Sequence, residues 1–341
     1  MKQKRILIVN VNWLGDVLFS TPLIRALRQK YPNAYVACMV IPRCREVLEH
    51  NPRIDELLVY DEEDAHKGVA GKLKFISELH KKNFSEAIIL HRSLTRTLLV
   101  ALAKVPKRIG YYTKKRGFLL TEKPLVPDSQ IHRIDLFCEL GEKVGVEVKE
   151  RAPEFYIKDE DRKFIENYLK GFGIGPADKV AVLNPGGNWM PKRWPVESFA
   201  KLAAGLVKEL GFSVVISGAK KDKPLARDIA RLSGVKVSCA CGETTLKELG
   251  ALMERAELII SNDSGPLHVA AAMGQPLIGL FGPTSPDITG PRGRGRICIL
   301  QKDVSCKIPC YKLNCADNRC MKAISAEDVF ECVRKILGDG C

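Results

Sequence analysis

The sequence has no apolar run that reaches the roughly 18–20 residues needed to cross a bilayer as a helix. It also lacks a short-period internal repeat, a low-complexity tract, zinc-finger spacing, an RNA-binding aromatic signature and a basic helix with heptads. These absences argue against a membrane-spanning chain, a repeat protein and the common nucleic-acid-binding modules. A chain of 341 residues is long enough for two α/β domains, each with its own core.

Acidic residues are fewer than basic ones, 40 against 54, and the formal net charge is +14. This excess favours an acidic partner, namely nucleic acid, an anionic membrane surface or a phosphorylated substrate. Asn10, Asn12 and Asp16 interrupt the apolar N-terminal stretch too early for a secretory signal. We therefore predict that this stretch forms a first buried strand and that the protein is cytoplasmic.

Short β-rich runs alternate with amphipathic helical segments along the whole chain, which predicts an α/β fold with two doubly wound parallel sheets. We expect domains at 1–155 and 156–325, followed by a closing helix at 326–341. The predicted strands cover residues 5–11, 34–40, 56–60, 86–91, 108–112, 179–187, 212–219, 235–240, 257–263 and 276–282.

The first predicted strand leads into Asn12-Trp13-Leu14-Gly15-Asp16, just before a helical pattern. Asp16 suits a helix cap, and it equally suits a general base that accepts a proton from a substrate hydroxyl. The residues alone leave both interpretations open.

The segment Leu-Asn-Pro-Gly-Gly-Asn-Trp-Met-Pro-Lys-Arg-Trp-Pro follows a strand in the second half. Gly186 and Gly187 allow close approach of an anion to the backbone, while Lys192 and Arg193 supply positive charge. A solvated surface loop is the alternative, but glycines, a lysine and a helix start after a strand favour phosphate binding. The spacing of a P-loop is absent.

A third segment runs from Asn262 to Thr284, across two predicted strand ends. Asp263 ends one strand, and Ser264 and Gly265 begin a helix whose first amides suit a diphosphate. His268 lies one turn into that helix, where both a structural role and a ligand contact are open. Thr284 follows the next strand, so it is expected at the same edge of the sheet.

Taken together, NWLGD with a following TP, KRWP, D-S-G-x-x-H-x-A-A-A and FGPTSP resemble glycosyltransferase family 9. That resemblance implies a GT-B fold, two Rossmann-like domains facing across a cleft. It also implies inverting transfer of a heptose from ADP-heptose to the Kdo/heptose inner core of lipopolysaccharide. Domain closure would bring the two halves of the site together.

Residue by residue, the resemblance implies that Asp16 is the base and that Lys192 stabilises the diphosphate leaving group. An acidic residue near the nucleotide ribose would correspond to Asp222. With the residues singled out above from the strand ends, the predicted donor-binding residues are Gly186, Gly187, Asp222, Asp263, Ser264, Gly265, His268 and Thr284.

The N-terminal half also carries its densest basic region between residues 92 and 116. We predict that Arg92, Arg96 and Arg108 bind an acidic acceptor of the Kdo–lipid A type, because arginine suits carboxylates and phosphates. The same charge would hold the protein at the anionic inner face of the cytoplasmic membrane. No nucleic acid partner is expected.

No cofactor or catalytic metal is expected, because Asp159-Glu160-Asp161 matches D-x-D but lies at a helix start. Four cysteines lie close together at Cys306, Cys310, Cys315 and Cys320. Structural zinc, disulfides and free thiols all remain open for them.

Two other functions remain open at this stage. The first is another nucleotide-sugar transferase, or an epimerase, of the same fold. The second is a basic binding protein without catalysis, which would not need a carboxylate base and a phosphate-binding lysine together.

Overall fold

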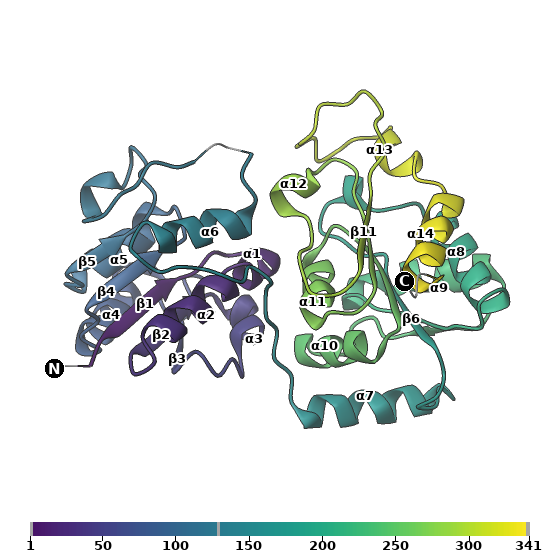
Figure 1. Cartoon of the computed structure of the whole chain (residues 1–341), viewed down its shortest axis with the longest axis horizontal. Helices are drawn as coiled ribbons and strands as arrows, with labels where there is room; N and C mark the ends of the chain where they lie inside the picture. Colours follow the sequence, from purple (N-terminus) through teal and green to yellow (C-terminus); the bar gives the residue numbers. More distant parts are fainter. Residues whose placement is uncertain (1–2, 128–129, 339–341) are drawn as a thin grey trace. The chain divides into compact units, whose positions relative to one another are not determined.

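The computed structural model describes residues 3–127 and 130–338. The chain divides into two compact units, Met1–Tyr156 and Ile157–Cys341, each an α/β layer structure (Figure 1). The last helix, α14 (Ala326–Gly338), belongs to the second unit. Residues 339–341 of the predicted closing segment lie outside the described residues.

The first unit contains a parallel five-stranded sheet in the order β3-β2-β1-β4-β5. Its strands are β1 (Arg5–Val9), β2 (Tyr35–Val40), β3 (Glu56–Val59), β4 (Glu86–Ile89) and β5 (Lys107–Ile109). The helices are α1 (Leu14–Leu18), α2 (Thr21–Lys30), α3 (Arg45–Leu48), α4 (Gly68–Lys81), α5 (Leu94–Leu102) and α6 (Arg133–Glu142).

The second unit contains a parallel six-stranded sheet in the order β11-β10-β9-β6-β7-β8. Its strands are β6 (Val180–Asn184), β7 (Ser213–Ile216), β8 (Val237–Cys239), β9 (Leu258–Asn262), β10 (Leu277–Leu280) and β11 (Ile297–Leu300). The other helices are α7 (Asp159–Gly171), α8 (Val196–Lys208), α9 (Lys223–Ser233), α10 (Leu246–Arg255), α11 (Gly265–Met273), α12 (Pro286–Thr289) and α13 (Arg319–Lys322).

The structure confirms the predicted α/β class and all ten predicted strands. Central strands such as β1, β6 and β9 are apolar runs buried on both faces, as helix-covered parallel sheets require. Sequence analysis missed β11, an edge strand that is largely half-buried and short.

Both sheets reverse their strand order at one point, between β1 and β4 and between β6 and β9. Ligands of doubly wound folds bind outside the carboxyl ends of the strands at such a point. The residues that follow β1, β4, β6 and β9 are therefore the ones to examine for a site.

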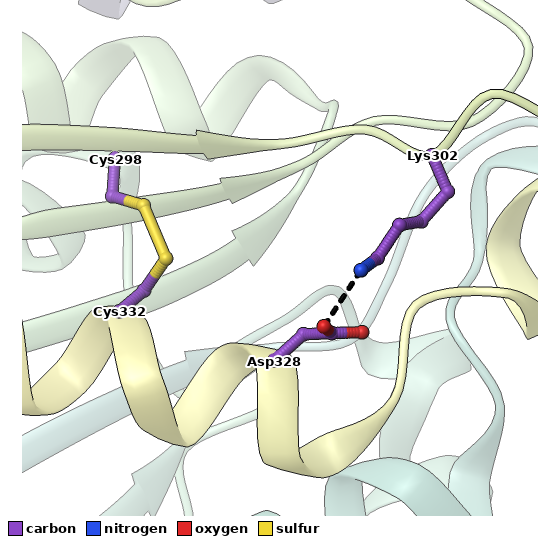
Figure 2. The surroundings of a disulfide bond; sticks show 4 residues. All are labelled: Cys298, Lys302, Asp328 and Cys332. Atoms are coloured by element: carbon purple, nitrogen blue, oxygen red, sulfur yellow. Dashed lines mark hydrogen bonds and ion pairs between the residues drawn. A yellow bond between two sulfur atoms is a disulfide. The ribbon is translucent and has the colours of Figure 1, made fainter.

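Two contacts join β11 and the segment that follows it to the C-terminal helix (Figure 2). A disulfide joins Cys298 of β11 to Cys332 of α14, and Lys302 Nζ lies 2.6 Å from the Asp328 carboxylate. Sequence analysis did not single out this cysteine pair. The four cysteines that it did single out, at positions 306, 310, 315 and 320, are not joined in disulfides in the structure. Within the described residues, no three His, Cys, Asp or Glu side chains are arranged to hold a metal ion.

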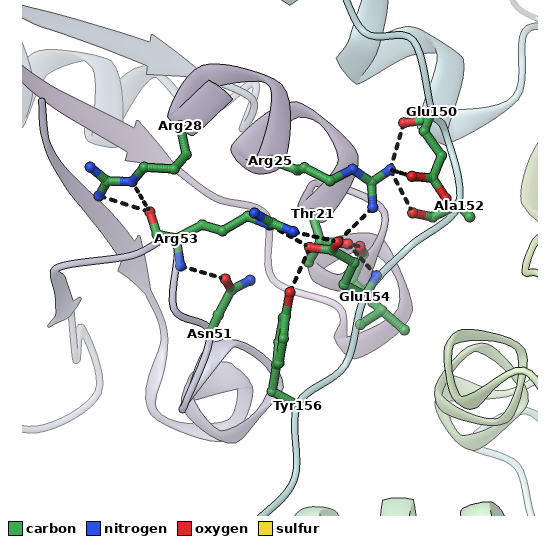
Figure 3. A network of polar contacts seen from close by, with 10 residues as sticks. Thr21, Arg25, Arg28, Asn51, Arg53, Glu150, Ala152, Glu154 and Tyr156 are labelled. Atoms are coloured by element: carbon green, nitrogen blue, oxygen red, sulfur yellow. Dashed lines mark hydrogen bonds and ion pairs between the residues drawn. The ribbon is translucent and has the colours of Figure 1, made fainter. Parts of the chain in front are cut away.

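The segment that ends the first unit is fixed to that unit by a largely buried carboxylate (Figure 3). Glu154 accepts hydrogen bonds from Arg25 at 2.7 Å, from Arg53 at 2.9 Å and from the Tyr156 hydroxyl at 3.0 Å. Its backbone N–H donates to Thr21 at 2.8 Å.

Among the helices described here, none has the length and apolar character that a membrane crossing requires.

Candidate active site

Asn262, the last residue of β9, organises the loop that follows the neighbouring strand β6. Its side chain is fully buried, and its amide donates to the Pro185 carbonyl at 2.7 Å. The amide oxygen accepts from the backbone N–H of Trp194 at 3.2 Å. One buried side chain thus ties both ends of the loop 185–194 to the point where the strand order reverses.

Lys192 and Asp263 meet at this edge of the sheet. Lys192 Nζ lies 2.6 Å from Oδ2 of Asp263, and the Thr284 hydroxyl donates to the same oxygen, also at 2.6 Å. The Asp263 side chain is 5% exposed, whereas that of Lys192 is 20% exposed. A buried carboxylate therefore holds a lysine whose side chain is only partly buried, and the centre of the Trp189 ring lies 5.1 Å from the Lys192 ammonium.

Helix α11 begins beside this group. Ser264 is its N-cap residue, and the Ser264 hydroxyl donates to Asn184 Oδ1 at 3.3 Å. Gly265 opens the first turn and Pro266 follows, a residue suited to the first turn because it has no N–H to satisfy. The positive end of the helix dipole thus lies next to Lys192, an arrangement that favours an anion. His268, one turn further on, is buried.

Asp222 lies against the glycine-rich turn after β6. A Cβ on Gly186 would come within 2.7 Å of Asp222 Oδ2, so only glycine leaves room for this buried carboxylate. The same oxygen accepts from the Ala219 N–H at 3.0 Å. Arg193 lies 3.7 Å from the other oxygen and donates to the Gly187 carbonyl at 2.7 Å.

Asp16 lies in the first unit, at the carboxyl end of β1. Trp13 is the N-cap of α1, and Asp16 stands in the first turn of that helix, half-buried. Burial raises the pKa of the Cys44 thiol; Arg43 and Arg96 oppose that rise and Asp16 adds to it. The carboxylate therefore lies in a region of mixed charge at the edge of the sheet.

The structure gives the three predicted acceptor arginines different surroundings. Arg92 is exposed as a residue, but partial desolvation of its guanidinium, followed by the charge of Arg133, lowers its pKa. Arg96 is 1% exposed. Arg108 donates to the carbonyls of Leu119 and Pro106, so its guanidinium braces the backbone near β5.

The structure thus brings Lys192, Asp263 and Thr284 together in the second unit, with Ser264 and Gly265 beside them. Sequence analysis missed the organising roles of Asn184 and Asn262. A signal for them was present, because each asparagine is the polar end of an otherwise apolar strand.

The sequence matches a known protein family over most of its length. The family model "Glycosyltransferase family 9 (heptosyltransferase)" matches residues 72–319. The chain is 28% identical to "Lipopolysaccharide heptosyltransferase 2" of Salmonella typhimurium, covering 84% of this chain and 85% of that protein. It is 27% identical to "Lipopolysaccharide heptosyltransferase 3" of Escherichia coli, covering 95% of each chain.

Two solved structures match the fold of this chain over nearly its whole length. A family 9 glycosyltransferase of Veillonella parvula superposes with a TM-score of 0.86 at 26% identity, covering 98% of this chain and 97% of that one. The ADP-heptose LPS heptosyltransferase II of E. coli gives a TM-score of 0.80 at 24% identity, covering 98% of each. These likenesses confirm the predicted GT-B fold. The chain belongs to glycosyltransferase family 9, the heptosyltransferase family, and is a glycosyltransferase.

Proposed function

We propose that this enzyme transfers a heptose from ADP-heptose to the sugar-acid inner core of lipopolysaccharide, with inversion at the anomeric carbon. Asp16 takes the proton from the acceptor hydroxyl while that oxygen bonds to the anomeric carbon. The bond from this carbon to the phosphate oxygen breaks, and ADP leaves with its electron pair. The relatives named for lipopolysaccharide heptosyl transfer support this choice of donor and acceptor.

The group formed by Lys192, Asp263 and Thr284 carries the donor side of the proposal. The Lys192 side chain is only partly buried, and its partner Asp263 directly precedes Ser264, the N-cap residue of α11. A fixed positive charge and oriented amides stabilise the charge that develops on a departing diphosphate. Asp263 acts as a positioning residue, because its buried oxygen orients both the ammonium and the Thr284 hydroxyl.

We also propose that one face of the first unit rests on an anionic bilayer. Helix α5 packs beside α4 and the short turn at 117–119. Its leucines at i, i+4 and i+8 are 40–52% exposed, and Phe118 on that turn is 75% exposed. Lys104, Lys114 and Lys115 on the flanking segments are exposed too. Apolar side chains bordered by lysines suit the interface of anionic lipids. The exposed apolar residues are Val69, Leu73, Leu94, Leu98, Leu102 and Phe118.

A vesicle experiment tests this face. The protein should sediment with vesicles that contain phosphatidylglycerol and remain free with pure phosphatidylcholine vesicles. The double variant Leu98→Ser/Phe118→Ser should lose binding, while Leu313→Ser, an exposed leucine of the second unit, should keep it. Equal sedimentation of both variants with the phosphatidylglycerol vesicles would show that this face does not bind the bilayer.

The activity itself is tested by following ADP release from ADP-heptose with a Kdo-bearing lipid A acceptor. We expect release that requires the acceptor and survives chelator. Other ADP- and UDP-sugars form the second arm of the experiment. Turnover with one of these sugars but not with ADP-heptose would reject the proposed donor, while the assignment as a glycosyltransferase would stand.

A further inference from the structure

The carboxyl edge of the first sheet gathers cationic side chains. Arg96 and Arg116 are 1% and 0% exposed, and Arg92 lies close enough to lower the pKa of Arg116. Burial, then Arg96 and Arg116, lower the pKa of His91 to about 4, so this histidine adds no charge at neutral pH. Two buried guanidinium groups in one region call for hydrogen-bond acceptors or an anionic partner.

Both terminal nitrogens of Arg116 find acceptors within the fold, whereas its buried Nε has none among the described residues. Its guanidinium donates to the carbonyls of His91 and Tyr111 and to the Thr97 hydroxyl. These contacts tie the segment after β5 to α5 and to the end of β4. Arg116 is therefore a structural residue.

Arg96 is different. One nitrogen, Nη1, donates to the Asn10 carbonyl at 3.2 Å. Its other terminal nitrogen, Nη2, is buried and has no hydrogen-bond acceptor among the described residues. The buried hydroxyl of Tyr60 likewise has none there, and the Tyr60 ring centre lies 5.8 Å from the guanidinium carbon. Two neighbouring buried donors without acceptors are costly unless something binds them.

Among the residues that the structure describes, the carboxylate that pairs with Arg96 belongs to an exposed side chain. The Glu62 carboxylate lies 3.5 Å from Nη2, and its side chain is 45% exposed, against 2% for Arg96. Glu62 belongs to the acidic turn 61–64 after β3, where the Asp61 carboxylate accepts the N–H groups of Glu63 and Asp64. A carboxylate thus reaches the buried guanidinium from the surface, at an ion-pair distance longer than that of a good hydrogen bond.

We propose that Arg96 and Tyr60 form a subsite for a carboxylate of the acceptor, and that Glu62 occupies this subsite until the acceptor displaces it. The inference rests on the proposed function, since it assigns the sugar-acid part of that acceptor. A carboxylate fits because it offers one oxygen to Nη2 and one to the Tyr60 hydroxyl. Glu62 shows that a carboxylate reaches this position from solvent. Asp16 and Arg96 both act on the Cys44 thiol, which places the subsite in the same region as the proposed base.

The test compares Glu62→Ala with Glu63→Ala, an exposed neighbour in the same turn. Binding of free Kdo is measured by calorimetry on the whole protein, and acceptor KM is measured separately. Removing the internal competitor should tighten Kdo binding about 5-fold and lower acceptor KM similarly, with donor KM unchanged. Glu63→Ala should change neither. An acceptor with its Kdo carboxyl reduced to the alcohol should bind wild type and Glu62→Ala equally.

The substitution Arg96→Gln tests the same subsite in the opposite direction, because it removes the charge that would bind the carboxylate. It should weaken Kdo binding at least 10-fold and leave ADP affinity unchanged, which a general loss of structure would not do. Unchanged Kdo binding in Glu62→Ala, or the same gain with the reduced acceptor, would overturn the subsite. A gain that depends on the lipid A phosphates instead of the carboxyl would overturn the carboxylate assignment. Because Kdo binding needs no turnover, absent heptosyl transfer with tighter binding in Glu62→Ala would reject the proposed function alone.

Discussion

Lys192 Nζ lies 2.6 Å from Oδ2 of Asp263, and this carboxylate is almost fully buried. The ion pair spans the point where the second sheet reverses its strand order, because Lys192 follows β6 and Asp263 follows β9. A lysine fixed in this way needs little reorganisation when a diphosphate binds or departs, which is the condition for effective charge stabilisation.

Removing the Lys192 ammonium should therefore lower the catalytic rate far more than the stability of the fold. We expect Lys192→Ala to lower kcat by about 100- to 1,000-fold, the range seen when one charge-stabilising donor is lost. Lys201→Ala, an exposed lysine on α8, is the matched control and should keep full activity. Steady-state kinetics with thermal unfolding of each variant checks this. Equal rates for both variants would remove Lys192 from the mechanism.

Gly186 and Gly187 give a second test, since they are neighbours with different surroundings. A Cβ at Gly186 would come within 2.7 Å of Asp222, whereas at Gly187 the nearest atoms lie 3.8 and 3.9 Å away. Gly186→Ala should displace the Asp222 carboxylate and raise donor KM about 10-fold. Gly187→Ala should be tolerated. The reverse order of effects would show that this carboxylate does not shape the donor site.

Glu154 should contribute strongly to the stability of the first unit. Its side chain is 13% exposed and pairs with Arg25 and Arg53, so Glu154→Gln removes the nearest carboxylate from the buried guanidinium of Arg25. We expect the free energy of unfolding to fall by about 3 kcal/mol. Glu150→Gln, half-exposed and 3.6 Å from Arg25, should cost less than about 1 kcal/mol. Denaturant titration measures both, and similar values would contradict this.

The same carboxylate makes stability depend on pH. Burial alone would raise the pKa of Glu154, but the hydrogen bonds from Arg53 and Arg25 outweigh it and lower the pKa. The stabilisation is therefore present above the unfolded-state pKa, about 4.3, and is lost as the pH falls through the lower folded-state value. Glu154→Gln should flatten this part of the stability profile.

His91 makes a separate contribution at higher pH. Its pKa is lowered to about 4, first by burial and then by Arg96 and Arg116, and its Nδ1 accepts from the Ser93 N–H at 3.0 Å. The unfolded chain binds a proton near pH 6.5, so stability should fall as the pH drops from about 6.5 towards 4. His91→Asn should remove this slope, as measured by unfolding at fixed denaturant. A slope unchanged by the substitution would assign it to other groups.

The sheets and the second-unit site were the more predictable parts. Apolar strands that end in Asn262-Asp263 or in Asn184-Pro185-Gly186-Gly187 place polar residues at one sheet edge, because parallel strands align their carboxyl ends. The Lys192–Asp263 contact was beyond sequence reasoning, since it depends on how the intervening loop folds back.

Side-chain roles within a basic region were the less predictable part. Charge density singled out Arg92, Arg96 and Arg108 together, but burial and backbone contacts separate them. The Cys298–Cys332 pairing depends on the placement of α14 against β11, which no local spacing encodes. The edge strand β11 was missed for a related reason, since its burial is only partial.

The most direct test of the proposed mechanism is the heptosylated acceptor formed by Asp16→Asn, detected by mass spectrometry and compared with wild type. Asparagine keeps the size of the side chain but cannot accept the proton. We predict normal ADP affinity with product formation at least 1,000-fold slower. Product formed at the wild-type rate would show that Asp16 is not the base, and the proposed mechanism would be wrong.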